Sequence, residues 1–451
     1  MTHESPKAKV LPLSSQTSDE GVLQVGGCDI RELANEYGTP LYVFDIETLT
    51  HQATSYIDAF TSQWPYGVEI HYASKAWINI PLARFLSSLG LSFDVVSGGE
   101  ISVLRQAGVS LSRSAFHGNN KGPQEIEEAL DAGIGQIVVN AHDEISLIES
   151  IASELGSKPK ILLRVSPGVD AHTHSATTTG LLDSKFGVSV ANGEALEACE
   201  EISASPHMDF RGIHMHLGSP IFGTEPYVEG IKVGSQLIKQ LADKGILVSD
   251  FSPGGGFAVA YTDDDDPPDA GVYAKAICET LASEADKLAF PPPKLIIEPG
   301  RSISARAGVA IYSVGSRKEI PDVRTYVAVD GGMSDNIRPA IYGSKYEVVP
   351  AERMHAVPEE TVTIAGKFCE SGDILAENVS LPRLRTNELI AIPAAGAYQL
   401  AMESNYNLSL KPEVIMVENG NSFTIRRRQI YEDLTRLDVT HGVDSLINTR
   451  D

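Results

Sequence analysis

The strongest constraint on the fold is a repeated alternation between about residues 39 and 300. Short β-branched or apolar runs are followed by polar turns and then by segments of helical period. This alternation is typical of parallel strands joined by crossover helices. We expect strands at 40–46, 69–74, 91–97, 114–119, 136–141, 160–166, 211–218 and 251–256, with 295–300 as a further closing segment. Eight or nine such units in roughly 260 residues have the size of a (β/α)₈ TIM-like barrel.

The pattern changes after about residue 301. Short alternating runs separated by turn residues, such as RTYVAVD and ETVTIAG, predict a mostly β barrel or sandwich domain that follows the barrel. A chain of 451 residues exceeds the usual size of one domain. We therefore expect a flexible tail over 1–20, a segment over 21–38 that pairs with the β domain, an α/β barrel over 39–300, and the β domain over 301–451.

Composition excludes several classes of protein. The chain has 36 Lys and Arg against 60 Asp and Glu, a net charge of −24, which disfavours binding to nucleic acid. Four widely spaced cysteines form no zinc or disulfide pattern, which favours a reducing cytoplasm. The N-terminus lacks a signal-peptide core, no run reaches the length of a membrane span, and the acidic run 263–266 is expected to be a solvated loop.

Active sites of such barrels lie at the C-terminal ends of the strands. Lys75 follows the run 69–74, Asp94 lies in the third run, 117–121 ends the fourth, and Arg164 lies in the sixth. A lysine shielded from water at such a strand end would have a lowered pKa and could form a Schiff base. The simpler interpretation of Lys75 is a surface lysine at the start of a helix.

Two glycine-rich strand ends suggest cofactor contacts. The run SPGGGFA (252–258) would allow backbone N–H groups to approach a phosphate, although it would also suit a plain tight turn. In IIEPGRS, a buried Glu298 could hold a protonated pyridine nitrogen, with Arg301 close by. Without other evidence, a structural ion pair between Glu298 and Arg301 is the favoured interpretation.

Three further groups of residues carry reactive side chains. His214 and His216 alternate on one strand, but with His172 and His174 they lack a completed metal-ligand spacing, so a stacked or core histidine is favoured over a metal site. Arg338 and Tyr342 are i and i+4, so they could clasp a carboxylate together. Cys369 stands beside Glu370 before a Gly turn, although a lone cysteine is more often inert.

Taken in order, these segments resemble diaminopimelate decarboxylase, a family of fold-type III pyridoxal-phosphate enzymes with an alanine racemase-like barrel. The resemblance covers nearly the whole chain after about residue 20 and rests on motifs in the family's order: YASKA, SGGE, FHGNNK, RVSPGVDAHTH, TGLLDSKFG, GIHMHLGS, GGGF, EPGRS, DGGMSDNIRP, CESGDIL and GAYQLAMESNYN. It implies a cytoplasmic lyase that converts meso-2,6-diaminopimelate to L-lysine and CO₂, the last step of lysine biosynthesis.

The resemblance also implies roles for individual residues. Lys75 would bond to pyridoxal phosphate, and Cys369 would donate a proton across the interface of a homodimer. The implied cofactor-binding residues are Lys75, Asp94, Arg164, His216 on the ring, Glu298 at its nitrogen, Tyr398, and Ser219, Gly255, Gly256, Gly300 and Arg301 at the phosphate. The implied substrate-binding residues are Arg301, Arg338, Tyr342, Glu370 and Tyr398.

Three departures from the family pattern bear on the substrate. Pro220 stands where Gln is more frequent, Phe368 where His is common, and Glu403 where a small residue is usual. The alternatives are a decarboxylase of the same fold acting on D-ornithine, D-lysine, carboxynorspermidine or carrier-bound glutamate, an amino-acid racemase, or a non-catalytic protein that binds pyridoxal phosphate. Arg338, Tyr342 and Glu370 argue against these alternatives and favour diaminopimelate as the substrate. We expect no metal, membrane or nucleic-acid partner.

Overall fold

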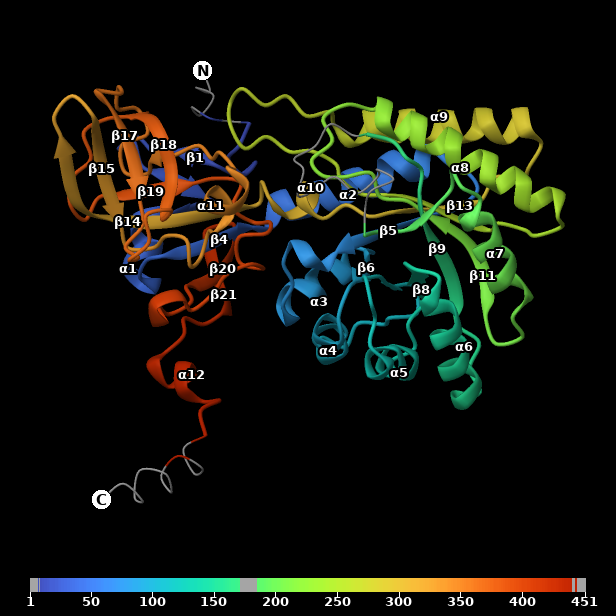
Figure 1. Cartoon of the computed structure of the whole chain (residues 1–451). Coiled ribbons are helices and arrows are strands. Elements are labelled where there is room, and N and C mark those ends of the chain that lie inside the picture. Colours follow the sequence, from blue (N-terminus) through green and yellow to red (C-terminus); the bar gives the residue numbers. More distant parts are fainter. Residues whose placement is uncertain (1–6, 8, 171–184, 440–442, 444–451) are drawn as a thin grey trace. The chain divides into compact units, whose positions relative to one another are not determined.

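The computed structural model describes residues 7, 9–170, 185–439 and 443 (Figure 1). The chain forms two compact units. Unit 1 comprises residues up to 14 together with 45–309 and 393–401, and unit 2 comprises 15–44, 310–392 and 402–451. His172 and His174 lie outside the described residues.

Unit 1 contains a closed barrel of parallel strands, as predicted. Neighbouring strands pair in chain order, β13 pairs with β5, and β8 pairs with β9, which closes the ring. The strands are β5 (Val68–Ala73), β6 (Ser92–Val95), β7 (Ala115–Phe116), β8 (Gln136–Val139), β9 (Lys160–Ser166), β11 (Asp209–His214), β12 (Asp250–Gly254) and β13 (Lys294–Ile297), and β10 (Val188–Ser189) adds to β9.

Helices connect the barrel strands. They are α2 (Ile46–Gln63), α3 (Ile80–Ser88), α4 (Gly98–Gln106), α5 (Pro123–Asp131), α6 (Asp143–Leu155), α7 (Glu194–Ala204), α8 (Glu225–Asp243) and α9 (Ala270–Leu288), with the short η1 (Ser74–Ala76) and α10 (Arg301–Ser304). Side-chain caps begin several of them: Asp45, Asn79 and Ser97 accept backbone N–H bonds at the starts of α2, α3 and α4. Ala115, Val138, Leu162 and Ile296 form a buried cluster contributed by four strands.

The prediction that 40–46 forms a barrel strand is wrong. Strand β4 (Leu41–Asp45) lies between β14 and β20 in the sheet of unit 2, and 295–300 supplies the closing barrel strand β13 instead. All five residues of β4 are buried, so its sequence has no exposed face that would distinguish a barrel strand from a central sheet strand. The long segment of unit 1 that contains the barrel accordingly begins at Asp45 rather than at residue 39.

Unit 2 is mostly β, as predicted. Its main sheet runs β18-β17-β15-β14-β4-β20-β21, with β16 and β19 attached, and β1, β2 and β3 form a small sheet. These elements are β1 (Gln16–Thr17), β2 (Leu23–Val25), β3 (Cys28–Asp29), β14 (Gly308–Ile320), β15 (Arg324–Val329), β16 (Val349–Pro350), β17 (Glu360–Ala365), β18 (Ile374–Leu381), β19 (Leu389–Ile392), β20 (Glu413–Glu418), β21 (Asn421–Arg426), α1 (Ile30–Tyr37), α11 (Arg338–Tyr342), η2 (Tyr406–Leu408) and α12 (Tyr431–Thr435).

The predicted flexible tail over 1–20 is wrong for its described part. Val10 and Leu11, within the short run VLPL, are buried, because removing their apolar side chains from water is favourable. Lys7 and Lys9 pair with Asp263 and Asp266 at 2.8 and 3.4 Å, so the acidic loop anchors this segment. Among the described residues, no helix is long and apolar enough to cross a membrane.

Candidate active site

The residues predicted at strand ends do lie at the C-terminal ends of the barrel strands. Lys75 lies in η1, which directly follows β5, and Asp94 lies near the end of β6. His117 follows β7, and Arg164 lies within β9. Because parallel barrel strands end on one face, these side chains come from four strands of the same face.

Glu298 is the centre of a buried hydrogen-bonded cluster. Ser252 Oγ donates to its Oε1 at 2.9 Å, and His214 Nε2 lies 3.0 Å from its Oε2. Burial raises the pKa of Glu298, but His214 and His117 lower it more, so it lies well below its ordinary value. Burial lowers the pKa of His214, against the opposing effect of Glu298.

The partners of Glu298 in this cluster differ from the predicted ion pair with Arg301, and His117 joins the cluster. The expected ion pair between Glu298 and Arg301 is not among the described ion pairs, in which the partners of Glu298 are histidines. His117 Nε2 lies 3.6 Å from Glu298 Oε1 and 3.8 Å from Asp94 Oδ1. The ligand atoms of His117, His214 and Glu298 lie within 4.8 Å of one another, a spacing that could also suit a metal ion.

The prediction that Lys75 has a lowered pKa is wrong. Burial lowers the pKa of Lys75, but the negative charge of Asp94, with smaller contributions from Tyr398 and Glu298, raises it above its ordinary value. Burial in turn raises the pKa of Asp94 to about 7, against the opposing effect of Lys75. The site therefore holds its lysine as a cation beside a carboxyl group.

Arg301 connects several predicted residues. It begins α10, is buried, and donates to Ser219 Oγ at 3.3 and 3.4 Å and to Tyr261 OH at 2.5 Å. Its guanidinium carbon lies 4.7 Å from the centre of the Tyr398 ring. The Tyr398 N–H donates to Ala76 O at 2.6 Å, beside Lys75. Tyr261 is a partner that the sequence did not reveal, because it lies 40 residues from Arg301.

The glycine run at the end of β12 is required by close backbone packing. A Cβ at Gly255 would lie 2.0 Å from Glu298 O, and one at Gly256 would lie 2.2 Å from Gly218 O. The Gly255 N–H donates to His216 Nδ1 at 3.3 Å. A Cβ at Gly300 would lie 2.9 Å from Ala73 Cβ. These glycines bring the ends of β5, β11, β12 and β13 close together.

In unit 2, Arg338 and Tyr342 are neighbours, as their spacing predicted. The guanidinium carbon of Arg338 lies 5.5 Å from the centre of the Tyr342 ring. Arg338 is 8% exposed and donates from Nε to Tyr346 OH at 2.8 Å and from Nη2 to Ser344 Oγ at 3.3 Å. These two partners fix the orientation of the guanidinium, and no sequence pattern indicated either of them.

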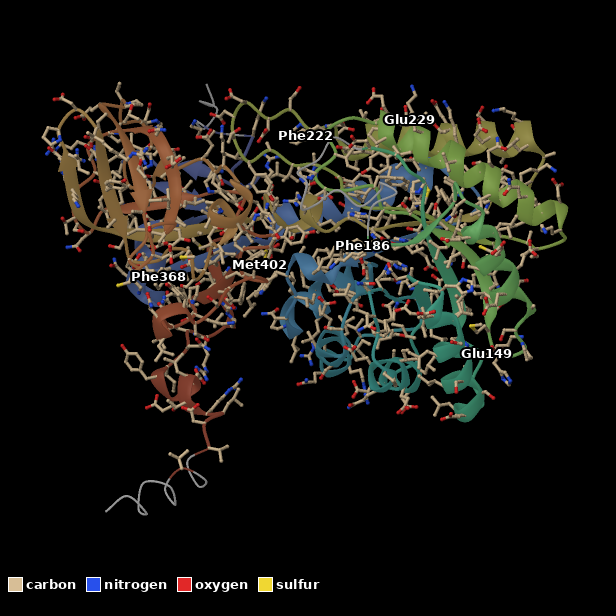
Figure 2. All side chains as sticks on the ribbon, in the orientation of Figure 1. Glu149, Phe186, Phe222, Glu229, Phe368 and Met402 are labelled. Carbon is tan, nitrogen blue, oxygen red and sulfur yellow. The ribbon has the colours of Figure 1, made fainter. Side chains whose placement is uncertain are left out.

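Cys369 and Glu370 are exposed on a loop that Asp373 holds in place. The buried Asp373 carboxylate accepts N–H bonds from Met333 at 2.6 Å and from Phe368 at 2.8 Å. It therefore ties the loop after β15 to the loop after β17. Asp373 is the last residue of the CESGD segment, and its place in that segment was the sequence signal that could have indicated its role in holding the loop. Phe368, labelled in Figure 2, packs against Tyr406 with ring centres 6.0 Å apart.

Glu403, one of the three departures from the family pattern, is held within unit 2. Its side chain is 6% exposed and lies 3.4 Å from Lys411 Nζ and 3.0 Å from Arg426 Nη2. Arg426 also makes a second, shorter contact through Nη1. Two cations thus compensate the charge of the buried Glu403 carboxylate.

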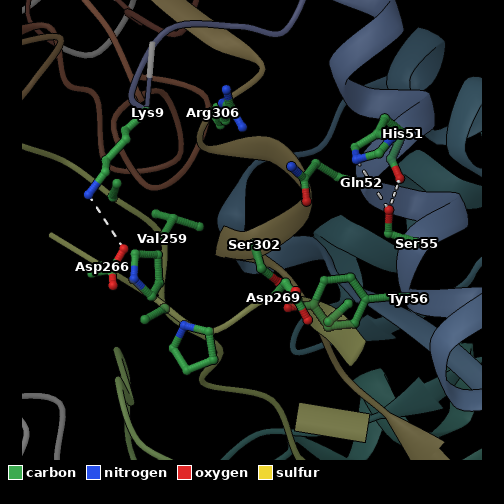
Figure 3. A pocket seen from close by; sticks show the side chains of 15 residues that line it. Lys9, His51, Gln52, Ser55, Tyr56, Val259, Asp266, Asp269, Ser302 and Arg306 are labelled. Atoms are coloured by element: carbon green, nitrogen blue, oxygen red, sulfur yellow. Dashed lines mark hydrogen bonds and ion pairs between the residues drawn. The ribbon is translucent and has the colours of Figure 1, made fainter. Parts of the chain in front are cut away.

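A separate pocket lies in unit 1 (Figure 3). Its volume is about 330 Å³, and α2, the segment 258–260, the segment 266–270 and the α10 region line it. Lys9 pairs with Asp266 at its rim, and His51 contacts Ser55. None of the predicted site residues lines this pocket.

The strand-end residues fit pyridoxal phosphate. Two buried polar atoms there, Asp94 Oδ1 and His117 Nε2, have no hydrogen-bond partner among the described residues. Lys75 offers an amine, ionised Glu298 offers an acceptor for a protonated ring nitrogen, and Arg301 offers positive charge for a phosphate. This donor set matches the aldehyde, the pyridine nitrogen and the phosphate of the cofactor in turn.

Comparison with known proteins agrees with this fit. Residues 48–305 match the family described as pyridoxal-dependent decarboxylase, pyridoxal binding domain. Diaminopimelate decarboxylase of Bacillus subtilis is 43% identical, covering 94% of this chain and 97% of its own length. Diaminopimelate decarboxylase structures in complex with L-lysine match from M. jannaschii (TM-score 0.88, 33% identity, 94% of this chain and 98% of that one) and from Helicobacter pylori (TM-score 0.83, 33% identity, 90% and 98%).

The barrel, the strand-end cluster and the family match define a pyridoxal-phosphate-dependent decarboxylase. The cofactor of this carboxy-lyase is pyridoxal phosphate. Within that class, the chain belongs to the diaminopimelate decarboxylase family.

Proposed function

We propose that this protein removes one carboxyl group from meso-diaminopimelate and releases L-lysine and CO₂. The observation that carries the proposal is the ionised, buried Glu298, held by His214 and Ser252 on the same barrel face as Lys75. The substrate follows from relatives at 37–43% identity that are named diaminopimelate decarboxylase. It also agrees with related structures that contain L-lysine.

Pyridoxal phosphate, when bound, supplies a ring that accepts the electron pair left by the departing CO₂. Lys75 would provide the amine for the cofactor's aldehyde, and Glu298 would accept a hydrogen bond from the ring nitrogen and favour its protonated form. Arg301, Ser219 and the backbone of 255–256 and 300 would hold the phosphate, and the His216 ring would lie against the cofactor. Asp94, Arg164 and Tyr398 complete the cofactor site.

The residues of unit 2 provide substrate recognition in this proposal. Arg338 and Tyr342 bind the distal carboxylate, because a buried guanidinium fixed by Tyr346 is preorganised for that group. Glu370 binds the distal ammonium. Cys369 donates a proton to the carbon that has lost its carboxyl group. A site with fixed partners for both distal charges discriminates strongly against substrates that lack them.

The exposed position of Cys369 supports a shared site between two subunits. We propose a cytoplasmic homodimer in which Cys369 of one subunit serves the cofactor of the other. A dimer would then be required for protonation but not for cofactor binding. Loss of turnover on dilution to monomers, with cofactor retained, is the expected result.

The direct test uses purified protein with pyridoxal phosphate and meso-diaminopimelate, alongside D-lysine, D-ornithine and L-ornithine. Carbon dioxide release is followed, and each product is identified by mass. We expect CO₂ and lysine from diaminopimelate alone. Turnover of another amino acid only would reject the substrate while retaining the decarboxylase mechanism.

A further inference from the structure

A buried ion pair joins the loop after β7 to the first turn of α6. Lys121 Nζ lies 3.3 Å from Glu144 Oε2, and the two side chains are 1% and 8% exposed. Lys121 Nζ also donates to Val138 O at 2.6 Å and Gly118 O at 3.0 Å. Glu144 accepts N–H bonds from Lys121 at 3.2 Å and from Asn140 at 2.6 Å. The pair thus ties the loop that follows β7 to the end of β8 and to the start of α6.

Asn140 extends this network to a third segment. Its Nδ2 donates to Asn119 Oδ1 at 2.8 Å and to Lys185 O at 3.3 Å. Its Oδ1 accepts the N–H of Gly187 at 3.2 Å. Asn140 is only 2% exposed. One buried amide therefore bonds both the loop 117–122 and the segment 185–187.

Both tethered segments hold groups of the cofactor site. The loop 117–122 begins with His117, whose Nε2 lies 3.6 Å from Glu298 Oε1. The segment 185–187 carries Phe186, labelled in Figure 2, whose ring centre lies 4.4 Å from the guanidinium carbon of Arg164. A Cβ at Gly187 would lie 3.2 Å from Arg164 O and closer still to the next backbone atoms, so this segment packs tightly on β9.

We propose that Asn140 is a positioning residue for the decarboxylation, acting with the Lys121–Glu144 pair. It sets the position of His117 beside Glu298 through Asn119, and the position of Phe186 beside Arg164 through Lys185 and Gly187. Asn140 itself touches neither Glu298 nor Lys75 in the described contacts. This inference rests on the proposed function for its turnover readout, but not for its cofactor readout.

The test compares two buried amides at opposite ends of β8. Asn140 follows the strand, whereas Gln136 begins it and donates to Asp250 Oδ2 at 2.6 Å, at the N-terminal end of the barrel. Asn140→Ala and Gln136→Ala each remove a buried amide, so both lower the melting temperature. Neither variant leaves an unpaired buried charge of the kind that Glu144→Ala would leave on Lys121.

For each variant, the affinity for pyridoxal phosphate and the absorbance of the bound cofactor are measured without substrate. The kcat and KM are then measured with diaminopimelate. We expect Asn140→Ala to weaken cofactor binding and lower kcat by about 10- to 100-fold, because small displacements of catalytic groups have effects of that size. The KM should change less than threefold. Gln136→Ala should stay within twofold of the wild type. Equal effects of the two variants on kcat and cofactor affinity would overturn the proposal.

Asn119→Ala provides a second test if Asn140→Ala does not fold. Asn119 is exposed and its replacement removes a single bond to Asn140, so the fold is retained. A severalfold loss of cofactor affinity supports the proposal, and an unchanged affinity contradicts it. If the wild type does not act on diaminopimelate, the proposed function fails, while the comparison of cofactor affinity and absorbance still decides the role of Asn140.

Discussion

His214 Nε2 lies 3.0 Å from Glu298 Oε2, in a buried contact that joins the end of β11 to the end of β13. This contact and the bond from Ser252 hold a negative charge in the barrel. In Glu298→Gln the charge is lost while the shape is kept. We expect kcat to fall by about 100-fold or more, as when a preorganised electrostatic group is removed.

The matched control for Glu298 is Glu284→Gln. Glu284 is equally buried in unit 1 but lies in α9 and pairs with exposed Lys287. Its replacement should leave kcat within about twofold, since its described partner, Lys287, lies on the same helix. Similar losses in both variants would mean that Glu298 acts only on stability.

Lys75→Ala should abolish the absorbance of lysine-bound pyridoxal phosphate. In the described part of the chain, Lys75 is the amine placed beside Asp94 at the end of β5. The control is Lys294→Ala, which removes a lysine that pairs with Glu69 at the start of β13. Absorbance spectra of both variants with added cofactor provide the measurement, and a band retained in Lys75→Ala would refute the assignment.

Arg338→Ala should raise the KM for diaminopimelate by about 100-fold, because a charge-assisted, fixed guanidinium is lost. Cofactor affinity should change little, since Arg338 is bonded to Tyr346 and Ser344 within unit 2. Arg353→Ala is the control, because Arg353 pairs with Glu388 in the same unit. Loss of cofactor from the Arg338 variant would argue against a role at the distal carboxylate.

The sequence predicted those features that depend on local pattern. The alternation of runs located Lys75, Asp94 and Glu298 correctly at strand ends, since each side chain's position follows from its own strand. It placed 40–46 in the wrong sheet because strand pairing is non-local, and a fully buried run has no face that identifies its partner.

The pKa shifts and hydrogen-bond partners of the site residues could not be predicted from the sequence. The raised pKa of Lys75 depends on the packing of Asp94 and Tyr398 beside it, and these residues are 19 or more positions away in the chain. Partners such as Tyr261 for Arg301 and Tyr346 for Arg338 are ordinary tyrosines until the fold brings them into contact. Family resemblance supplied residue roles, but not the hydrogen bonds that orient them.

Cys369 should be the cysteine that thiol reagents label in the native protein. It is exposed, whereas Cys28, Cys199 and Cys278 are buried. Burial raises the pKa of Cys199 and of Cys278 to about 12, so few thiolates form there at neutral pH. After labelling with iodoacetamide, peptide mass spectrometry should find Cys369 as the modified cysteine. An activity assay of the labelled protein should show a loss of turnover.

Cys369→Ser is the control for this labelling. It should take up no label in the native state and should retain pyridoxal phosphate while its kcat falls. Rapid labelling of Cys199 or Cys278 in the folded protein would show that the helices carrying them open readily. Full activity after modification of Cys369 would contradict its role as proton donor.

Protonation of Glu69 at acid pH should lower the stability of the barrel. Burial raises the pKa of Glu69, but bonds to His71 and Lys294 at 3.1 and 3.0 Å lower it to about 2. A carboxyl group whose folded pKa is lowered stabilises the fold above its unfolded pKa of about 4.3, and that contribution is lost as pH falls toward 2. We expect Glu69→Gln to cost about 2 kcal/mol of unfolding free energy at pH 7.

The measurement is urea unfolding of the wild type and of Glu69→Gln at pH 7 and at stepwise lower pH. The difference between the two proteins should be largest at pH 7 and should shrink as pH falls from about 4.5 to 2, because a protonated Glu69 and the glutamine that replaces it are then equally neutral. Exposed Glu127 supplies the control, and Glu127→Gln should change stability little at any pH. A Glu69→Gln difference that stays constant with pH would mean that packing, rather than the charge on Glu69, accounts for its effect.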